Sequence, residues 1–247
     1  MNSNQPVTLL PVAAVAIAVL LGACSNDPAG PDAAPTTAPP SSTPTTPSSD
    51  QPIDLARVPE DTTLEGQDYL VPYLAGDGDR DPAEGPMRAV VGVPGGYLGG
   101  GPVIQSSSGN ADAAFWGTVT RVATDACLGG SRPVGPTVRD LASALAAQRH
   151  MTATSPVPVT VGGYHGLYIK TVAPANLDRC RDKGVQILTG GGSWLSLDVP
   201  GATFREWILD VAGQRVVAGT RGDAHLTDED PLNRMIESAE FTSLDDQ

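Results

Sequence analysis

REWILD (residues 205–210) and QRVVA (residues 214–218), joined by Val211, Ala212 and Gly213, are the stretch that decides the fold prediction. Both runs are rich in the β-branched and aromatic side chains that favour strands. The joining segment ends in glycine, which readily adopts the positive φ of a tight hairpin turn. This stretch therefore predicts an antiparallel β-hairpin.

Short strand-like runs lie on both sides of the hairpin, bounded by clusters of glycine, proline and aspartate. We expect strands at residues 68–74, 87–93, 102–105, 113–122, 157–161, 166–172, 185–188 and 194–197, with a returning edge strand at 240–242.

Two helices interrupt these strands. The first begins at Thr137, whose hydroxyl can cap the helix while Asp140 reciprocates, and its apolar residues follow a spacing of three and four. The second is expected to be capped by Thr227, with Asp230 at the third position, and to end near Ser238. Strands with helices inserted indicate an α+β domain over residues 53–247, a mostly antiparallel sheet packed by two or more helices.

Four segments carry a resemblance to known proteins: the turn at residues 94–97 (PGGY), GPTVRDLASAL (135–145), VTVGGYHGLYI (159–169) and WILDVAGQRVV (207–217). Together they resemble a group of uncharacterised actinobacterial lipoproteins and exported domains, which at fold level is similar to the Mog1/PsbP family. The resemblance covers roughly residues 87–241. It implies a fold and a location, but no reaction and no catalytic residues.

The N-terminal segment predicts export. VTLLPVAAVAIAVLL (residues 7–21) is shorter than the roughly 20 residues that a membrane span needs, so it is typical of a signal peptide. LGAC (residues 21–24) resembles the lipobox of bacterial lipoproteins, in which the cysteine sulfur receives a lipid. We therefore expect a signal peptide over residues 1–23 and fatty acyl chains, such as palmitate, on Cys24. An uncleaved N-terminal anchor is the alternative.

Residues 24–52 are expected to form a disordered linker behind the lipidated cysteine. Between residues 25 and 50 the chain has seven prolines, ten Ser/Thr and no aromatic or large aliphatic side chain, so nothing there offsets the entropy of ordering. Such a segment acts as a spacer between the bilayer and the domain. Thr/Pro-rich tethers are often O-glycosylated, which the sequence leaves open.

The charge of the chain limits its partners. The formal net charge is -13, and the domain keeps 25 acids against 15 bases because three acids and no base precede it. Such a surface repels phosphate backbones and anionic lipid headgroups, so we expect no nucleic-acid partner. A polybasic patch cannot explain membrane attachment, whereas two or three acyl chains on Cys24 give durable anchoring.

Cys127 and Cys180 are the two cysteines that remain once Cys24 carries lipid. In an exported domain an even remainder favours a disulfide. Closing a loop of about 53 residues stabilises the fold by about 4 kcal/mol in the chain-entropy treatment. Two buried thiols or an exposed redox pair are the alternatives.

Three short motifs echo known sites and fail at decisive positions. Asp77, Asp79 and Asp81 alternate as in a calcium loop, but Pro82 stands where the turn needs glycine. PGGYLGGGP (residues 94–102) precedes a strand where a phosphate cradle needs a helix. GGSWL (residues 191–195) lacks the final glycine of a nucleophile elbow.

Histidines and aromatic residues give no defined site. His150, His165 and His225 are scattered without metal-ligand spacing, and a triad of Ser193, His165 and Asp198 is one of many that can be drawn. Trp116, Trp194, Trp207, Tyr164 and Tyr168 can line a ligand pocket or fill the core, and core packing is our interpretation.

These observations lead to a hypothesis of a membrane-anchored lipoprotein on the extracytoplasmic side of the cell membrane. Its domain is expected to bind an envelope protein or a small ligand as a sensor or assembly factor, with no catalytic residue, metal or cofactor assigned. The alternatives are a cell-envelope hydrolase with an unrecognised active site and a carrier of an apolar small molecule.

Overall fold

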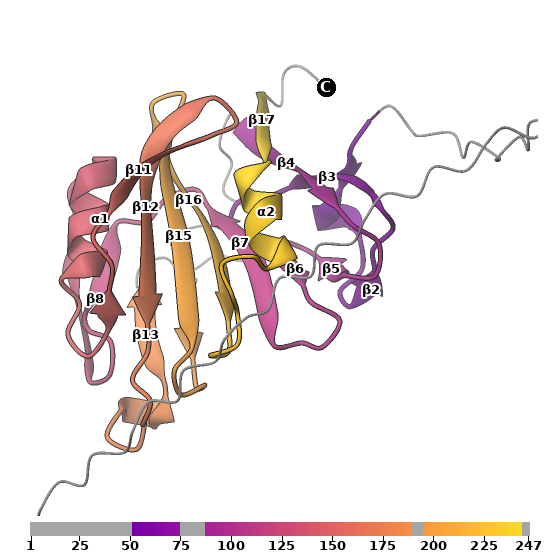
Figure 1. Ribbon diagram of the computed structural model, residues 1–247. Coiled ribbons are helices and arrows are strands. Elements are labelled where there is room, and N and C mark those ends of the chain that lie inside the picture. Colours follow the sequence, from indigo (N-terminus) through magenta and orange to yellow (C-terminus); the bar gives the residue numbers. More distant parts are fainter. Residues whose placement is uncertain (1–50, 75–86, 189–194, 244–247) are drawn as a thin grey trace, which may run out of the picture. The chain divides into compact units, whose positions relative to one another are not determined.

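The computed structural model describes residues 51–74, 87–188 and 195–243, all of which belong to one compact unit, residues 47–247 (Figure 1). Strands make up 48% of the structure and helices 13%. The described residues hold two α-helices, α1 (Val138–Ala146) and α2 (Pro231–Glu237), and two single 3₁₀ turns, η1 (Leu55–Arg57) and η2 (Arg181–Lys183).

A nine-stranded antiparallel sheet lies at the centre. Its strands follow in the order β10 (Thr152–Ala153), β12 (Tyr164–Val172), β15 (Thr203–Val211), β16 (Gln214–Gly222), β7 (Ala111–Trp116), β6 (Val103–Gln105), β5 (Leu98–Gly100) and β2 (Thr62–Thr63), and β11 (Val157–Val161) also pairs with β12.

The predicted hairpin forms the middle of this sheet. β15 and β16 pair over nine positions, from Thr203 opposite Gly222 to Val211 opposite Gln214. Ala212 and Gly213 make the turn, both with positive φ, and the Gly213 amide donates to the Asp210 side chain at 3.0 Å. A two-residue turn with two positive φ values matches the twist of the flanking strands, so the hairpin prediction is confirmed.

Two four-stranded sheets accompany the central one. The first has the order β1 (Ile53–Asp54), β3 (Gln67–Val71), β4 (Met87–Val93) and β17 (Glu240–Ser243), with β1 parallel to β3. The second has the order β14 (Leu195–Leu197), β13 (Val185–Leu188), β8 (Arg121–Asp125) and β9 (Gly129–Pro133).

Successive side chains of the central strands point to opposite faces of the sheet and pack into two separate cores. On β15, Trp207 and Leu209 join one core with β3, β4 and α2, while Phe204 and Ile208 join the other with α1, β8 and β13. Figure 1 shows α1, β8 and β13 on one side of the central sheet and α2, β3 and β4 on the other. The domain is therefore a layered β-sandwich with one helix in each outer layer.

The expected α+β fold of the Mog1/PsbP type is wrong. We expected a mostly antiparallel sheet packed by helices, whereas the strands form three sheets, and the layers on the central sheet are themselves mostly sheet. The predicted strand at 113–122 is two strands, β7 and β8, in different sheets. β5 (LGG) and β9 (GGSRP) were missed because glycine and proline hide them from any pattern of strand propensity.

The helix caps give one confirmation and one correction. The Thr137 hydroxyl accepts from the Asp140 amide, and the Asp140 carboxylate accepts from the Thr137 amide, as predicted. α2 is capped by Asp230 and not by Thr227, because Pro231 suits the first helical position and cannot donate from deeper in the helix. The end at Ser238 and the edge strand after it are confirmed.

Candidate functional site

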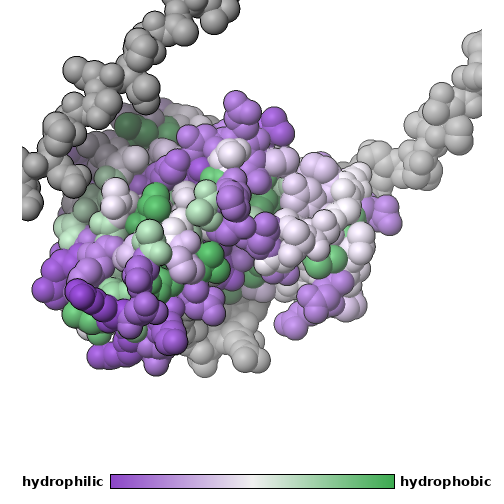
Figure 2. Space-filling view, turned by 60° about the horizontal axis from the view of Figure 1, so that its bottom comes forward, coloured by the Kyte–Doolittle hydropathy of each residue, from purple (hydrophilic) through white to green (hydrophobic). Residues whose placement is uncertain are grey.

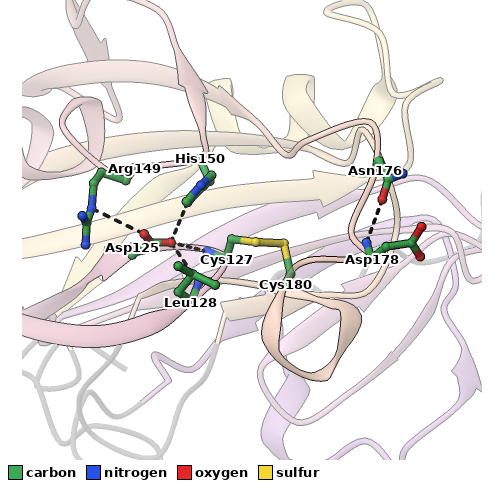
Figure 3. The surroundings of a disulfide bond; sticks show 8 residues. All are labelled: Asp125, Cys127, Leu128, Arg149, His150, Asn176, Asp178 and Cys180. Atoms are coloured by element: carbon green, nitrogen blue, oxygen red, sulfur yellow. Dashed lines mark hydrogen bonds and ion pairs between the residues drawn. A yellow bond between two sulfur atoms is a disulfide. The ribbon is translucent and has the colours of Figure 1, made fainter.

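The predicted disulfide is present. Cys127 and Cys180 are joined at 2.07 Å, and both are buried. The bond ties the turn between β8 and β9 to the loop that precedes β13 (Figure 3). In that loop the Arg181 amide also donates to the Cys127 carbonyl at 2.8 Å. A polar cluster lies beside this disulfide at the margin of the core that contains α1, and it is the candidate site.

Asp125, the last residue of β8, lies at the centre of this cluster. Its side chain is 1% exposed, and one carboxylate oxygen, Oδ1, accepts from the Cys127 amide at 3.0 Å and the Leu128 amide at 2.8 Å. Two amides of the tight turn are thereby satisfied by one carboxylate. Asp125 therefore fixes the conformation of the turn that carries Cys127.

Two residues of the loop after α1 converge on the same carboxylate. His150 Nδ1 lies 2.8 Å from Asp125 Oδ1, and Arg149 Nε lies 3.4 Å from Oδ2 (Figure 3). Burial on its own raises the pKa of Asp125, but the Leu128 amide, His150 and the Cys127 amide together lower it below the ordinary value. Asp125 is therefore a buried anion that pins the loop to the β8–β9 turn.

The arrangement also orients a histidine for proton transfer. A carboxylate accepts only, so neutral His150 donates from Nδ1 and keeps Nε2 as a base. The ring is 48% exposed, and His150 adopts a positive φ of 67°, which is uncommon outside glycine. Chemically, the pair can accept and return a proton at the surface.

The other sites suggested by the sequence are not assembled in the structure or lie outside the described residues. His165 Nδ1 lies 3.0 Å from the Thr160 hydroxyl, and Asp198 is exposed. Cys24, the aspartates 77, 79 and 81, and Ser193 with its GGSWL motif up to residue 194 lie outside the described residues.

The PGGY turn borders a shallow groove. β5 follows this turn where a phosphate cradle would need a helix. The groove between the turn and α2 has a volume of about 290 Å³ and is lined by Gly92, Pro94, Tyr97, Pro231, Arg234, Met235 and Ser238.

The aromatic residues do not form one set. Trp116 and Trp207 are buried on opposite faces of the central sheet, in different cores. Tyr168 packs on Trp207 with ring centroids 5.0 Å apart, and Tyr164 meets Phe241 edge-on at 5.4 Å. The core-packing interpretation is confirmed for these four residues, and Trp194 lies outside the described residues.

A buried carboxyl group lies in the second core. Glu206 is 1% exposed on the face of β15 that carries Phe204 and Ile208, and within the described residues neither of its oxygens has a hydrogen-bond partner. Burial raises the pKa of Glu206 to about 8, and the nearby Thr171 hydroxyl offsets only part of the rise. Glu206 is therefore protonated over the acid and neutral range.

The neighbouring residue on β15 is a buried cation. Arg205 donates to Asp228 Oδ1 through Nε at 3.1 Å and Nη2 at 2.7 Å, and Lys170 donates to the same oxygen at 3.1 Å. Hydrogen bonds from Arg205 and Lys170 lower the pKa of Asp228. These bonds hold the loop before α2 against the central sheet.

Comparison with known proteins adds no assignment. No protein-family model, curated protein or solved structure matches this chain.

Sequence reasoning missed the contact between Asp125 and His150, and it missed that Glu206 is a buried acid. Asp125 and His150 are 25 positions apart, and only the docking of the post-α1 loop brings them together. Glu206 offered a weak signal, since it stands between the apolar residues Phe204 and Ile208 on the same face of the strand.

Proposed function

We propose that this chain is an exported bacterial lipoprotein, anchored by lipid on Cys24, whose β-sandwich domain binds an envelope protein or a small ligand. The observation that carries the proposal is the disulfide. The chain has three cysteines, and Cys127 and Cys180 bond to each other, which leaves Cys24 for another role. Structural disulfides persist in oxidising compartments and are rare in the cytosol, so the bond supports export.

The N-terminal sequence supports the anchor. The apolar run 7–21, the LGAC tetrapeptide and the Pro/Thr/Ser-rich stretch follow in the order that a lipid-anchored, spaced domain requires. Among the described residues, no helix combines the length and the apolar character that crossing a membrane takes.

The groove beside α2 supports a binding role. Tyr97 supplies an aromatic ring, Pro94 and Met235 supply apolar walls, and Arg234 supplies a cation in an otherwise acidic domain. Ligand sites combine apolar walls with a few polar groups in this way. On the face in Figure 2, hydrophobic side chains are scattered among hydrophilic ones.

The anchor is tested by fractionation. Wild type is expected in the detergent-soluble membrane fraction, and Cys24→Ala is expected to lose lipid labelling by radioactive palmitate. Equal labelling of the two proteins contradicts the proposed anchor.

The binding role is tested by crosslinking in intact membranes, followed by purification. Wild type is expected to recover a stoichiometric partner or ligand, Arg234→Glu to lose it, and Arg139→Glu on the exposed face of α1 to keep it. Recovery that is unchanged in Arg234→Glu removes the groove from the proposal.

A second candidate function, hydrolysis of an envelope ester, is favoured by one observation: the 2.8 Å contact between His150 and the buried Asp125. A histidine oriented by a carboxylate can deprotonate water. Hydrolysis of p-nitrophenyl esters by wild type, lost in His150→Gln and retained in His165→Gln, is the expected result for a hydrolase. Equal rates in all three proteins exclude this function for the pair.

A further inference from the structure

Leu128, at the turn between β8 and β9, is 52% exposed, more than any other large hydrophobic residue that the structure describes. Single exposed leucines are common on protein surfaces, so the exposure of Leu128 alone does not indicate a binding site. What sets Leu128 apart is how firmly the turn presents it and which charges surround it.

Several independent contacts fix this turn. Asp125 accepts from the Leu128 amide, the neighbouring Cys127 is bonded to Cys180, and the Arg181 amide donates to the Cys127 carbonyl. Gly129 and Gly130 both have positive φ, which lets the chain reverse immediately after Leu128. The leucine is thus held on a fixed, exposed turn, so this turn loses little conformational freedom on binding.

Several cations lie on the segments that meet at this turn. The Arg181 guanidinium lies beside Gly129, only 3.1 Å from where a Cβ on that glycine would be, and Arg149 flanks Asp125. Arg179 and Lys183 lie one and three positions from Cys180, which the disulfide joins to Cys127, and Lys183 is one of the two lysines of the chain. We call Leu128 with these four bases and His150 the Leu128 tip.

The charge of the tip differs from that of the rest of the domain. The segments that carry the Leu128 tip, residues 125–128, 149–150 and 178–183, have four Arg/Lys and three aspartates. The aspartates are Asp125, Asp178 and Asp182, of which Asp125 is buried. The remaining domain then has 11 bases against 22 acids. Near a negatively charged surface, this asymmetry turns the tip toward the surface and the rest of the domain away from it.

We propose that the Leu128 tip is a membrane-contact surface, in which Leu128 enters the headgroup region of the bilayer and the surrounding bases bind anionic phospholipid headgroups. The inference rests on the proposed function, because the anchor holds the domain at high local concentration next to a bilayer, where a weak contact suffices. Headgroup phosphates are the anions that juxtamembrane bases bind.

The two lysines provide the test. The full-length chain is purified from bacterial membranes and reconstituted into phosphatidylcholine vesicles with or without 30% phosphatidylglycerol. Acetylation of Lys183 and Lys170 by an uncharged reagent is then followed by mass spectrometry. Lys170 lies on β12 in contact with Asp228, so it is the internal reference.

The expected result is that phosphatidylglycerol slows acetylation of Lys183 relative to Lys170 by about threefold, and that 0.5 M salt removes the effect. Leu128→Ser is expected to reduce the protection, and Val157→Ser, at a site 47% exposed on the β11 edge, to leave it unchanged.

Equal Lys183 acetylation in both kinds of vesicle overturns the proposal. Protection that needs a second protein and not the anionic lipid also overturns it, and assigns the tip to an acidic protein partner. The mass of the N-terminal peptide is read in the same samples. An uncleaved leader contradicts lipidation but still brings the chain to the vesicle, so the tip is tested independently of the anchor.

Discussion

Replacing Glu206 by glutamine removes a buried acid whose pKa folding raises strongly. In the folded chain the pKa of Glu206 is about 8, against an ordinary value of 4.5, because burial penalises the charged form. The folded state therefore holds a proton that the unfolded state releases above pH 4.5. The stability that protonated Glu206 contributes is therefore complete below pH 4.5 and is lost as the pH rises toward 8.

The magnitude follows from the two pKa values. Each pH unit between them lowers the free energy of unfolding by about 1.36 kcal/mol, so Glu206 contributes a fall of roughly 2.7 kcal/mol from pH 5 to pH 7. Burial of the Asp112 carboxyl raises its pKa as well, although Arg221 opposes the rise. The contribution of Glu206 is therefore the difference between wild type and Glu206→Gln in how the free energy of unfolding changes with pH. The slope of wild type alone also contains the contribution of Asp112.

The assay is urea unfolding of the purified chain at pH 5, 6 and 7, without reductant so that the disulfide stays intact. Glu206→Gln should flatten the pH dependence by about the amount given, and Glu237→Gln, an exposed glutamate of α2, should leave it as in wild type. Equal slopes for wild type and Glu206→Gln would refute the claim that Glu206 is buried and protonated.

The remaining predictions concern other parts of the fold. Asp228→Asn should lower the free energy of unfolding by about 2 kcal/mol, less than the ~3–5 kcal/mol of a fully buried pair because Asp228 is 72% exposed, and unchanged urea denaturation contradicts the Arg205 contact. Replacing both disulfide cysteines by serine should destabilise the chain by about 4 kcal/mol, measured the same way. A loss under 1 kcal/mol would show that the cross-link constrains little. Because the hydrogen bonds to Asp125 lower its pKa, its stabilisation is present above the ordinary pKa of aspartate and is lost as the pH falls through the folded value. Asp125→Asn should therefore unfold more easily than wild type at pH 6, by a difference that shrinks as the pH falls below the ordinary pKa of aspartate, and a difference that does not change with pH contradicts the buried anion.

Local signals in the sequence predicted the local structure. The turn at Ala212 and Gly213 and the capping box of Thr137 and Asp140 depend on residues within four positions of each other, and both are present. The cap of α2 was misplaced by three residues because the rule for Thr/Asp spacing competed with the stronger constraint of Pro231 at the first helical position.

The layers of the fold depended on distant contacts that no local pattern encodes. Residues 113–122 look like one strand, but the chain leaves the central sheet after Trp116 and enters another sheet at Arg121. The disulfide was predictable because elimination left two cysteines, whereas the Asp125–His150 contact exists only once the post-α1 loop has docked on the β8–β9 turn.

The mass of the N-terminal peptide of the chain purified from bacterial membranes tests the central claim most directly. The proposal predicts a peptide that begins at Cys24 and carries a diacylglyceryl group on its sulfur, from a protein whose two other cysteines resist alkylation until they are reduced. An unmodified peptide beginning at Met1, from a cytosolic protein with three freely alkylated cysteines, would contradict both the anchor and the export.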